Sequence, residues 1–166
     1  DTAPTGHTLK ALNAPAAIRT FLLRILRMKA KIDNIKSFML KKGDTPQLIA
    51  HLEQICAKVE RLTLILRNPK FVNINLVSIA SEAGFQECFR TIQFLKKMEI
   101  PVGNIIVNNI MPNFGDKEWA LAEEHPSVGL VHREYVMQQP YLQRYRDLCA
   151  EENLKLVGLS RLPFEP

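Results

Sequence analysis

The sequence predicts an α/β fold in which a helical segment precedes a parallel β-sheet. In the second half of the chain, apolar runs rich in β-branched residues lie at 71–79, 103–110 and 154–159, separated by helical segments. Strands that alternate with helices favour a parallel sheet with right-handed crossover connections. Between residues 14 and 66, apolar residues recur every three or four positions, which is typical of amphipathic helices.

Length and composition exclude several classes of protein. The chain of 166 residues is 46% hydrophobic and 23% charged, which suffices for a folded core and excludes a disordered or collagen-like chain. No apolar run reaches the ~18–20 residues of a membrane span, and the N-terminus does not resemble a signal peptide. Cys56, Cys88 and Cys149 are widely spaced and form no CxxC pair. We therefore expect a cytoplasmic protein with core thiols and no protein zinc site.

The positive charge is concentrated near the N-terminus. The net charge is +5, and the first 42 residues carry nine basic side chains against Asp1 and Asp33. Such a segment can meet nucleic acid, an anionic membrane or a phosphorylated ligand, or it can form a solvated helix face. Because the charge lies on amphipathic helices without interleaved aromatic residues, we expect no nucleic-acid partner.

Two consecutive helices are predicted before the first strand. Residues 14–42 form the first, which Gly43 ends as a C-terminal cap. The second begins at Pro46, with Asp44 or Thr45 as its N-cap. Its apolar residues alternate spacings of four and three, as in a coiled-coil seam, so we expect an antiparallel hairpin. The predicted seam consists of Leu48, Leu52, Ile55, Val59, Leu62 and Leu66.

The first helix carries more apolar surface than one seam needs. Two interpretations remain open at this point: a fully packed helical pair, or a hydrophobic groove that binds apolar clients. Flexible Met and Leu side chains suit a surface that accepts varied apolar partners. The residues of such a groove are Phe21, Leu22, Ile25, Leu26, Met28 and Met39.

The second half places polar residues where strands end. Ser81 and Glu82 are predicted to cap a helix that ends before Pro101, while a short helix near 117–124 and a longer one over 128–150, kinked at Pro140, precede the last strand. Ligands of parallel sheets bind beyond the carboxyl ends of the strands. This rule places Asn108-Asn109 and the segment 162–164 on the functional edge, although an Asn can also simply cap a turn.

The first eight residues, DTAPTGHT, are rich in turn-forming residues. Gly6 permits a close backbone approach to a ligand, and Thr5 and Thr8 supply hydroxyls. The N–H groups of such a turn can form an anion-binding nest, and an Asp at a strand end commonly helps to anchor nucleotide-bound Mg²⁺. A phosphate-sensing loop and a plain structural turn both fit these residues.

DTAPTGHT at 1–8 resembles the second switch motif of the arsenical pump-driving and tail-anchored-protein-targeting ATPases (ArsA-type), a branch of the deviant-Walker P-loop NTPases. The segment 104–109 resembles the family's strand that ends in an amide pair, and 162–165 its C-terminal segment. The resemblance implies the C-terminal half of a parallel-sheet P-loop NTPase fold with an α-helical insert. Its parts would be a switch loop at 1–13, a helical client-binding insert at 14–68, and the remaining nucleotide-binding domain at 69–166.

The resemblance assigns roles in ATP hydrolysis to the switch residues. Asp1 would organise Mg²⁺ and water, and the backbone of Gly6 would sense the γ-phosphate of ATP. Thr5, His7 and Thr8 would relay the nucleotide state to the helical insert.

The resemblance also assigns a base-binding role to the second half. Asn108 would read the adenine edge, an amide being suited because it donates and accepts at once. Asn109 would lie beside it, and Pro163 and Phe164 would pack against the base.

The implied function is the C-terminal part of an ATPase that couples ATP binding and hydrolysis to a membrane-protein client or an anion pump. The expected partners are a second copy in a homodimer and either a hydrophobic transmembrane helix or a membrane pump subunit. The family's phosphate-binding loop does not occur within these 166 residues, so we expect this chain alone to be inactive. The alternative is a nonenzymatic module that binds apolar helices and lacks the phosphate-binding loop. A Gly-rich, Lys-containing loop upstream of Asp1 in the complete gene would favour the ATPase.

Overall fold

A computed structural model describes residues 5–36, 46–115, 119 and 125–161. The chain divides into two compact units, which are described separately. The first unit contains Asp1–Val72 together with Met98–Ile100. The second contains Asn73–Lys97 and Pro101–Pro166. The expected α/β class is confirmed by the parallel sheet and helices of the second unit.

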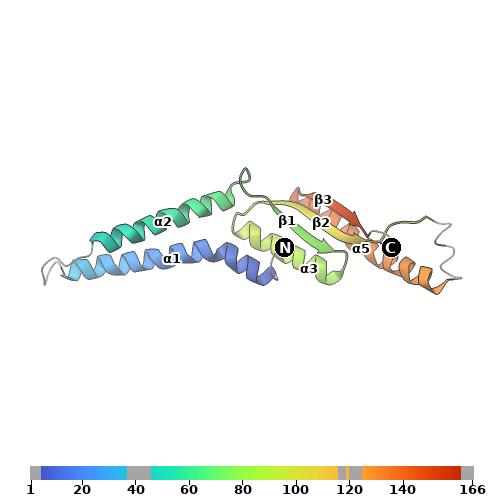
Figure 1. Cartoon of the computed structure of the whole chain (residues 1–166), viewed down its shortest axis with the longest axis horizontal. Helices are drawn as coiled ribbons and strands as arrows, with labels where there is room; N and C mark the ends of the chain where they lie inside the picture. The colour runs from blue at the N-terminus through green and yellow to red at the C-terminus, as the bar shows by residue number, and fades with distance from the viewer. Residues whose placement is uncertain (1–4, 37–45, 116–118, 120–124, 162–166) are drawn as a thin grey trace, which may run out of the picture. The chain divides into compact units, whose positions relative to one another are not determined.

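The first unit contains two helices that lie side by side and run in opposite directions, as predicted (Figure 1). Helix α1 spans Thr5–Lys36 and helix α2 spans Pro46–Arg67. The helix α1 begins well before residue 14 and continues through Pro15, whose ring is buried. The expected capping residues of the connection, Asp44 and Thr45, and the expected stop at residue 43 lie outside the described residues.

The buried face of α2 differs from the predicted seam. Ile55 and Leu62 were expected at the helix interface, but their exposed fractions are 36% and 45%. Cys56, one position further along, is buried, and Thr63 is half-buried. At these two turns the inward position is therefore one residue later than the hydrophobic spacing predicts. The seam residues Leu52, Val59 and Leu66 are half-buried.

The second unit is a three-stranded parallel sheet in the order β1-β2-β3. Its strands are β1 (Ile74–Ile79), β2 (Val102–Ile110) and β3 (Lys155–Ser160). Helix α3 (Glu82–Lys97) connects β1 to β2, and helix α5 (Pro126–Glu152) precedes β3. The predicted parallel arrangement of the strands, with helices between them, is confirmed.

Some boundaries in the second unit differ from those predicted. The first strand begins at Ile74 rather than at Phe71, which lies in a turn and is 72% exposed. Helix α5 is longer than the predicted 128–150 and, as expected, contains Pro140 within it. Of the short helix expected near 117–124, only Trp119 is described, and it is helical.

The core of the second unit lies on one face of the sheet. Both α3 and α5 contribute to this core, and both contact β2 (Figure 1). Its most deeply buried side chains are Ile92, Leu95, Ile105, Val107 and Tyr145. The opposite face carries the alternate residues of the strands, among which Val77 and Ile79 are 68% and 51% exposed. Within the described residues, the sheet is therefore packed on one face only.

Candidate functional site at the carboxyl edge of the sheet

The carboxyl ends of β1, β2 and β3 lie along one edge of the sheet because the strands are parallel. Asn108 lies at this edge, where it pairs in register with Ile79 of β1. The side chains of Asn108 and Asn109 are both exposed. Two of the predicted base-binding residues thus lie where open parallel sheets bind ligands. The other two, Pro163 and Phe164, follow β3 and lie outside the described residues.

A β-bulge shapes this end of β2. Val107 and Ile110 are three positions apart on β2, but their partners on β3 are only two positions apart. Asn109 takes up the extra residue with a φ of 59°, in the left-handed region that Asn tolerates better than most residues. The N–H of Asn109 donates to Oδ1 of Asn108 at 2.8 Å. Bulges commonly re-aim a side chain next to a functional site, and this one sets the direction of the Asn108 carboxamide.

Gln138 on α5 holds the bulge from the buried side. Its Nε2 donates to the carbonyl of Asn109 at 3.1 Å, and its Oε1 accepts the N–H of Met111 at 2.8 Å. The side chain is only 7% exposed. Gln138 was not among the predicted site residues. A signal was present, because Gln138 shares one helical stripe with three buried side chains, those of Leu142, Tyr145 and Cys149.

The turn after β1 is closely packed. The N–H of Gly84 donates to Oγ of Ser81 at 3.1 Å, and α3 begins at Glu82, so the predicted cap is confirmed. A Cβ atom at Gly84 would lie 2.6 Å from the carbonyl oxygen of Ile79. Only glycine therefore lets the first turn of α3 lie this close to the end of β1.

Charged side chains join α3, α5 and the end of β3. Arg144 on α5 pairs with Glu82, and its guanidinium lies 4.1 Å from the centre of the Phe85 ring. Hydrogen bonds, first from Arg144 and then from Gln86, hold the pKa of Glu82 below its ordinary value. Arg161, the residue directly after β3, lies 3.4 Å from a carboxylate oxygen on α5 and brings a positive charge to the carboxyl edge.

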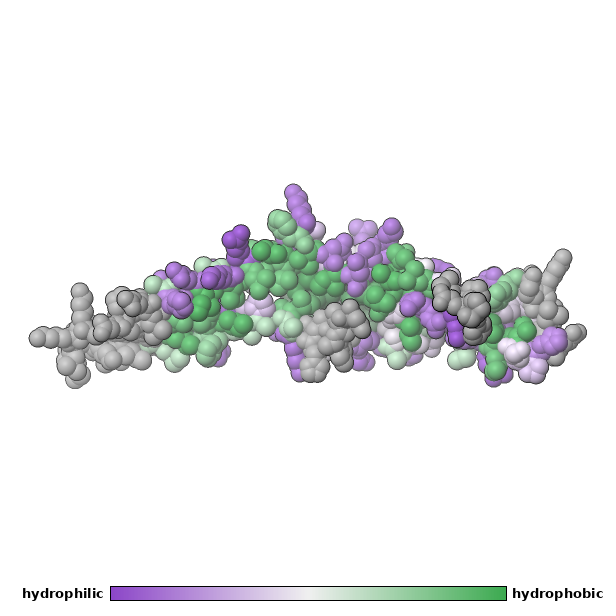
Figure 2. Space-filling model, viewed as in Figure 1, coloured by the Kyte–Doolittle hydropathy of each residue, from purple (hydrophilic) through white to green (hydrophobic). Residues whose placement is uncertain are grey.

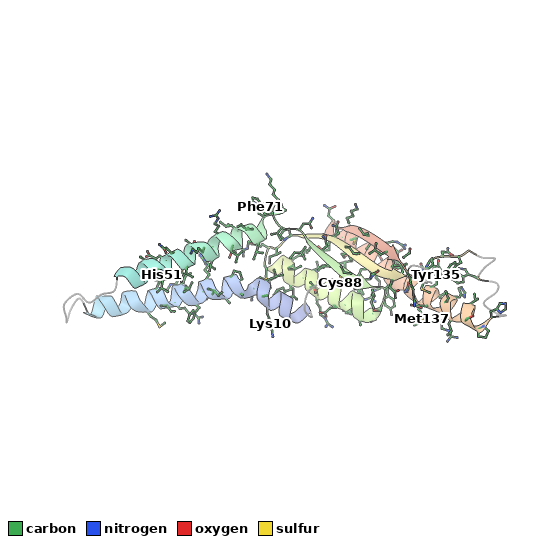
Figure 3. All side chains as sticks on the ribbon, in the orientation of Figure 1. Lys10, His51, Phe71, Cys88, Tyr135 and Met137 are labelled. Atoms are coloured by element: carbon green, nitrogen blue, oxygen red, sulfur yellow. The ribbon has the colours of Figure 1, made fainter. Side chains whose placement is uncertain are left out.

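All three cysteines are free and buried, as predicted. Burial, reinforced by the neighbouring Cys149, raises the pKa of the Cys88 thiol to about 12. Burial also raises the pKa of Cys149. Figure 3 shows Cys88 on α3, within the second unit. Both thiols are therefore held in the protonated form at neutral pH and act as core residues.

The part of the chain that the structure describes contains neither a metal-ligand cluster nor a helix able to span a membrane. Within the described ranges, no three His, Cys, Asp or Glu side chains lie together as a ligand set for a metal ion. Over the same ranges, no helix combines the length and the apolar character that crossing a membrane requires.

The switch residues lie in or before α1. Asp1 lies outside the described residues, while Thr5, Gly6, His7 and Thr8 belong to the first turns of the helix. The expectation of a loop is therefore wrong for residues 5–13. The segment after Thr8 contains good helix formers such as Leu, Lys and Ala, which explains its helical state. Gly6 is exposed, with open space where a Cβ atom would lie.

The predicted groove residues on α1 fall into three groups. Phe21 and Met28 are 63% and 57% exposed, whereas Leu22 is 7% exposed and Ile25 and Leu26 are half-buried. Leu22 therefore belongs to the packed interior of the first unit, and the expectation that it lines an open groove is wrong. Met39 lies outside the described residues.

The exposed apolar side chains of the first unit continue along one stripe of α1. Ile18, Phe21 and Met28 are exposed, and half-buried Ile25 completes a spacing of three, four and three. Helix α2 adds exposed apolar side chains of its own, including Leu64 at 70%. Figure 2 shows hydrophobic surface over this helical pair.

Comparison with known proteins decides the family. A family profile described as an anion-transporting ATPase matches residues 1–159, which is nearly the whole chain. The chain belongs to the anion-transporting ATPase family. The profile spans both the helical pair and the sheet, including the bulge at Asn108 and Asn109.

The curated relatives of this chain are ATPases by name. ATPase GET3 of Candida dubliniensis is 29% identical over 160 residues, covering 96% of this chain and 43% of the relative. ATPase GET3A of Arabidopsis thaliana is 27% identical over 172 residues, covering 100% of this chain and 45% of the relative. ATPase get3 of Schizosaccharomyces pombe is 27% identical over 169 residues, covering 99% and 48%. The chain thus spans less than half the length of these relatives.

Proposed function

We propose that this chain is the C-terminal part of an ATPase and that the carboxyl edge of its sheet binds the adenine base of ATP. The observation that carries this proposal is the exposed Asn108 carboxamide, presented by a β-bulge at the end of a parallel strand. Adenine offers a donor and an adjacent acceptor on one edge, and a carboxamide can pair with both. Asn109 lies beside it, and Pro163 and Phe164 after β3 would pack against the base.

The proposal assigns the phosphate end of ATP to the N-terminal residues. Asp1 has the carboxylate oxygens that suit Mg²⁺, a hard cation that prefers oxygen ligands. The backbone of Gly6 would sense the γ-phosphate, and open space around its Cα is compatible with a close approach. Thr5, His7 and Thr8 would relay the nucleotide state along α1, to which they belong. Mg²⁺ would neutralise phosphate charge when bound.

The helical pair would bind the client. Exposed Phe21 and Met28, with half-buried Ile25 between them, provide an apolar stripe that suits a hydrophobic transmembrane helix. We propose this client in preference to a membrane pump subunit because the stripe is apolar and runs along a helix. A homodimer and a cytoplasmic location complete the proposal, and three free thiols fit a reducing compartment.

The alternative is a nonenzymatic module that binds apolar helices without nucleotide. Binding of Mg²⁺–ATP and Mg²⁺–GTP to the 166-residue chain separates the two functions. The ATPase proposal expects tighter binding of ATP than of GTP, and loss of this preference in Asn108→Ala. Asn75→Ala is the matched control, because Asn75 is an exposed asparagine at the amino end of β1. A chain that captures apolar helices and binds neither nucleotide would favour the nonenzymatic module.

A further inference from the structure

The bulge of β2 leaves backbone groups that the sheet does not pair. An extra residue in one strand interrupts the ladder, so the N–H and C=O groups beside it need other partners. On the β3 side, the carbonyl of Ile110 accepts the N–H of Arg161 at 2.8 Å. The groups on either side of Ile110, which are the carbonyl of Asn109 and the N–H of Met111, point instead to Gln138.

One buried carboxamide satisfies both groups at once. Gln138 donates from Nε2 to the carbonyl of Asn109 and accepts at Oε1 from the N–H of Met111. Among uncharged side chains, only a carboxamide presents a separate donor and acceptor in this geometry. Because Gln138 is 7% exposed, water does not readily replace these bonds.

From this geometry we infer that Gln138 is a positioning residue that sets the base selectivity of the site through Asn108. The inference rests on the proposed adenine site. Gln138 fixes the left-handed conformation of Asn109, and the N–H of Asn109 in turn holds Oδ1 of Asn108 at 2.8 Å. The orientation of the Asn108 carboxamide therefore depends on a side chain that does not itself reach the exposed edge.

Orientation matters because adenine and guanine differ at the atom that a fixed carboxamide oxygen meets. Adenine carries an amino group at this position and guanine carries a carbonyl, so an oxygen held in place accepts from adenine and opposes guanine. A carboxamide that is free to rotate by 180° exchanges its oxygen and nitrogen and pairs with either base. Loss of the Gln138 bonds should therefore reduce selectivity more than it reduces affinity for ATP.

The test compares Mg²⁺–ATP and Mg²⁺–GTP affinities of the 166-residue chain by titration calorimetry. We expect the wild-type chain to prefer ATP by roughly tenfold, the scale of one paired hydrogen-bonding contact to a base. Gln138→Met keeps the length and packing of the side chain but removes both bonds, and it should lower the ratio to about two or less. Gln139→Met is the matched control, since Gln139 bonds to the carbonyl of Tyr135 within its own helix. Its ratio should match the wild type.

Two results distinguish failure of the inference from failure of the proposed function. A wild-type chain that binds neither nucleotide, or both equally, overturns the adenine site and the inference with it. A selective wild type with an equally selective Gln138→Met overturns the inference alone.

If Gln138→Met fails to fold, hydrogen exchange of the wild-type chain tests the inference instead. The amide hydrogen of Met111, which donates to Oε1 of Gln138, should exchange at least about tenfold more slowly than that of exposed Asn113. Exchange as fast as that of Asn113 would show that the bulge is not held and would overturn the inference.

Discussion

The hydroxyl of Tyr145 on α5 donates to Oγ of Ser78 on β1 at 2.7 Å, and it also lies 3.2 Å from the carbonyl oxygen of Ile79. Ser78 in turn donates to the carbonyl of Gly84 at 2.9 Å. Tyr145 itself is fully buried. One tyrosine thus connects α5, the end of β1 and the first turn of α3, immediately behind the carboxyl edge.

We expect Tyr145→Phe to destabilise the second unit by about 1–2 kcal/mol, because it removes the hydroxyl from a buried hydrogen-bond network. Urea unfolding followed by circular dichroism measures this change. Tyr141→Phe, one turn earlier and half-buried, is the control and should change stability by less than about 0.5 kcal/mol. Equal effects of the two substitutions would contradict the role given to the Tyr145 hydroxyl.

Substitution by alanine should change the stability in opposite directions at two glycines, Gly84 and Gly6. Gly84→Ala places a Cβ atom 2.6 Å from a backbone oxygen, so we expect a loss of about 1–3 kcal/mol. Gly6→Ala meets open space within α1 and should stabilise that helix by about 0.5–1 kcal/mol. Thermal unfolding of both variants tests the pair, and a stable Gly84→Ala would show that α3 packs less closely than described.

Alkaline pH should destabilise the second unit. Burial raises the pKa of Cys88 from 9.0 to about 12, and that of Tyr145 from 10.0 to about 12. The folded form therefore keeps these protons to a higher pH than the unfolded form. Their contribution to stability is complete below pH ~9 and is lost as the pH rises towards ~12. We expect the free energy of unfolding in urea to fall over this range.

Cys88→Ala tests whether the Cys88 thiol contributes to the loss of stability at alkaline pH. The variant loses packing and so starts from a lower stability, but its stability should fall less steeply from pH ~9 upward. An identical slope in the variant and the wild type would mean that the thiol does not contribute to the alkaline loss.

Substitutions in the exposed stripe of α1 should weaken client binding without a large loss of stability. Phe21→Asp and Met28→Asp change exposed side chains, so we expect the free energy of unfolding to change by no more than about 1 kcal/mol. Capture of a fluorescent hydrophobic helix should weaken at least about tenfold, because an unpaired charge would be desolvated in the complex. Leu22→Asp is the contrasting variant, since this side chain is buried and the substitution should unfold the helical pair. Unchanged capture by both exposed-site variants would exclude a client site on this stripe.

The regular features of the fold could be predicted from the sequence, whereas the packing of one helix against another could not. Alternating strands and helices predicted the parallel sheet, and the position of Asn108 at a strand end predicted its place on the carboxyl edge. The spacing of Ile55 and Leu62 matches a coiled coil, but both side chains are exposed and Cys56 is buried instead. Hydrophobic spacing on a single helix contains no information about the side chains it meets.

Gln138 illustrates the same limit at the site. Its bonds depend on a bulge, which arises from the relative register of β2 and β3 and leaves no local pattern in the sequence. What the sequence does show is a polar residue on the stripe of α5 that holds Leu142 and Tyr145. A polar side chain on an otherwise apolar stripe indicates a buried hydrogen bond but does not identify its partner.

The most direct test of the central proposal is an NMR titration of the ¹⁵N-labelled chain with Mg²⁺–ATP. The account predicts that the largest shifts fall on the side-chain amide of Asn108 and on the backbone amides of Asn109 and Arg161, at the carboxyl edge. The amides of Asn75 and Val102, at the amino ends of β1 and β2, serve as internal controls and should not shift. Largest shifts at those amino ends, or no shifts at all, would contradict an adenine site at Asn108.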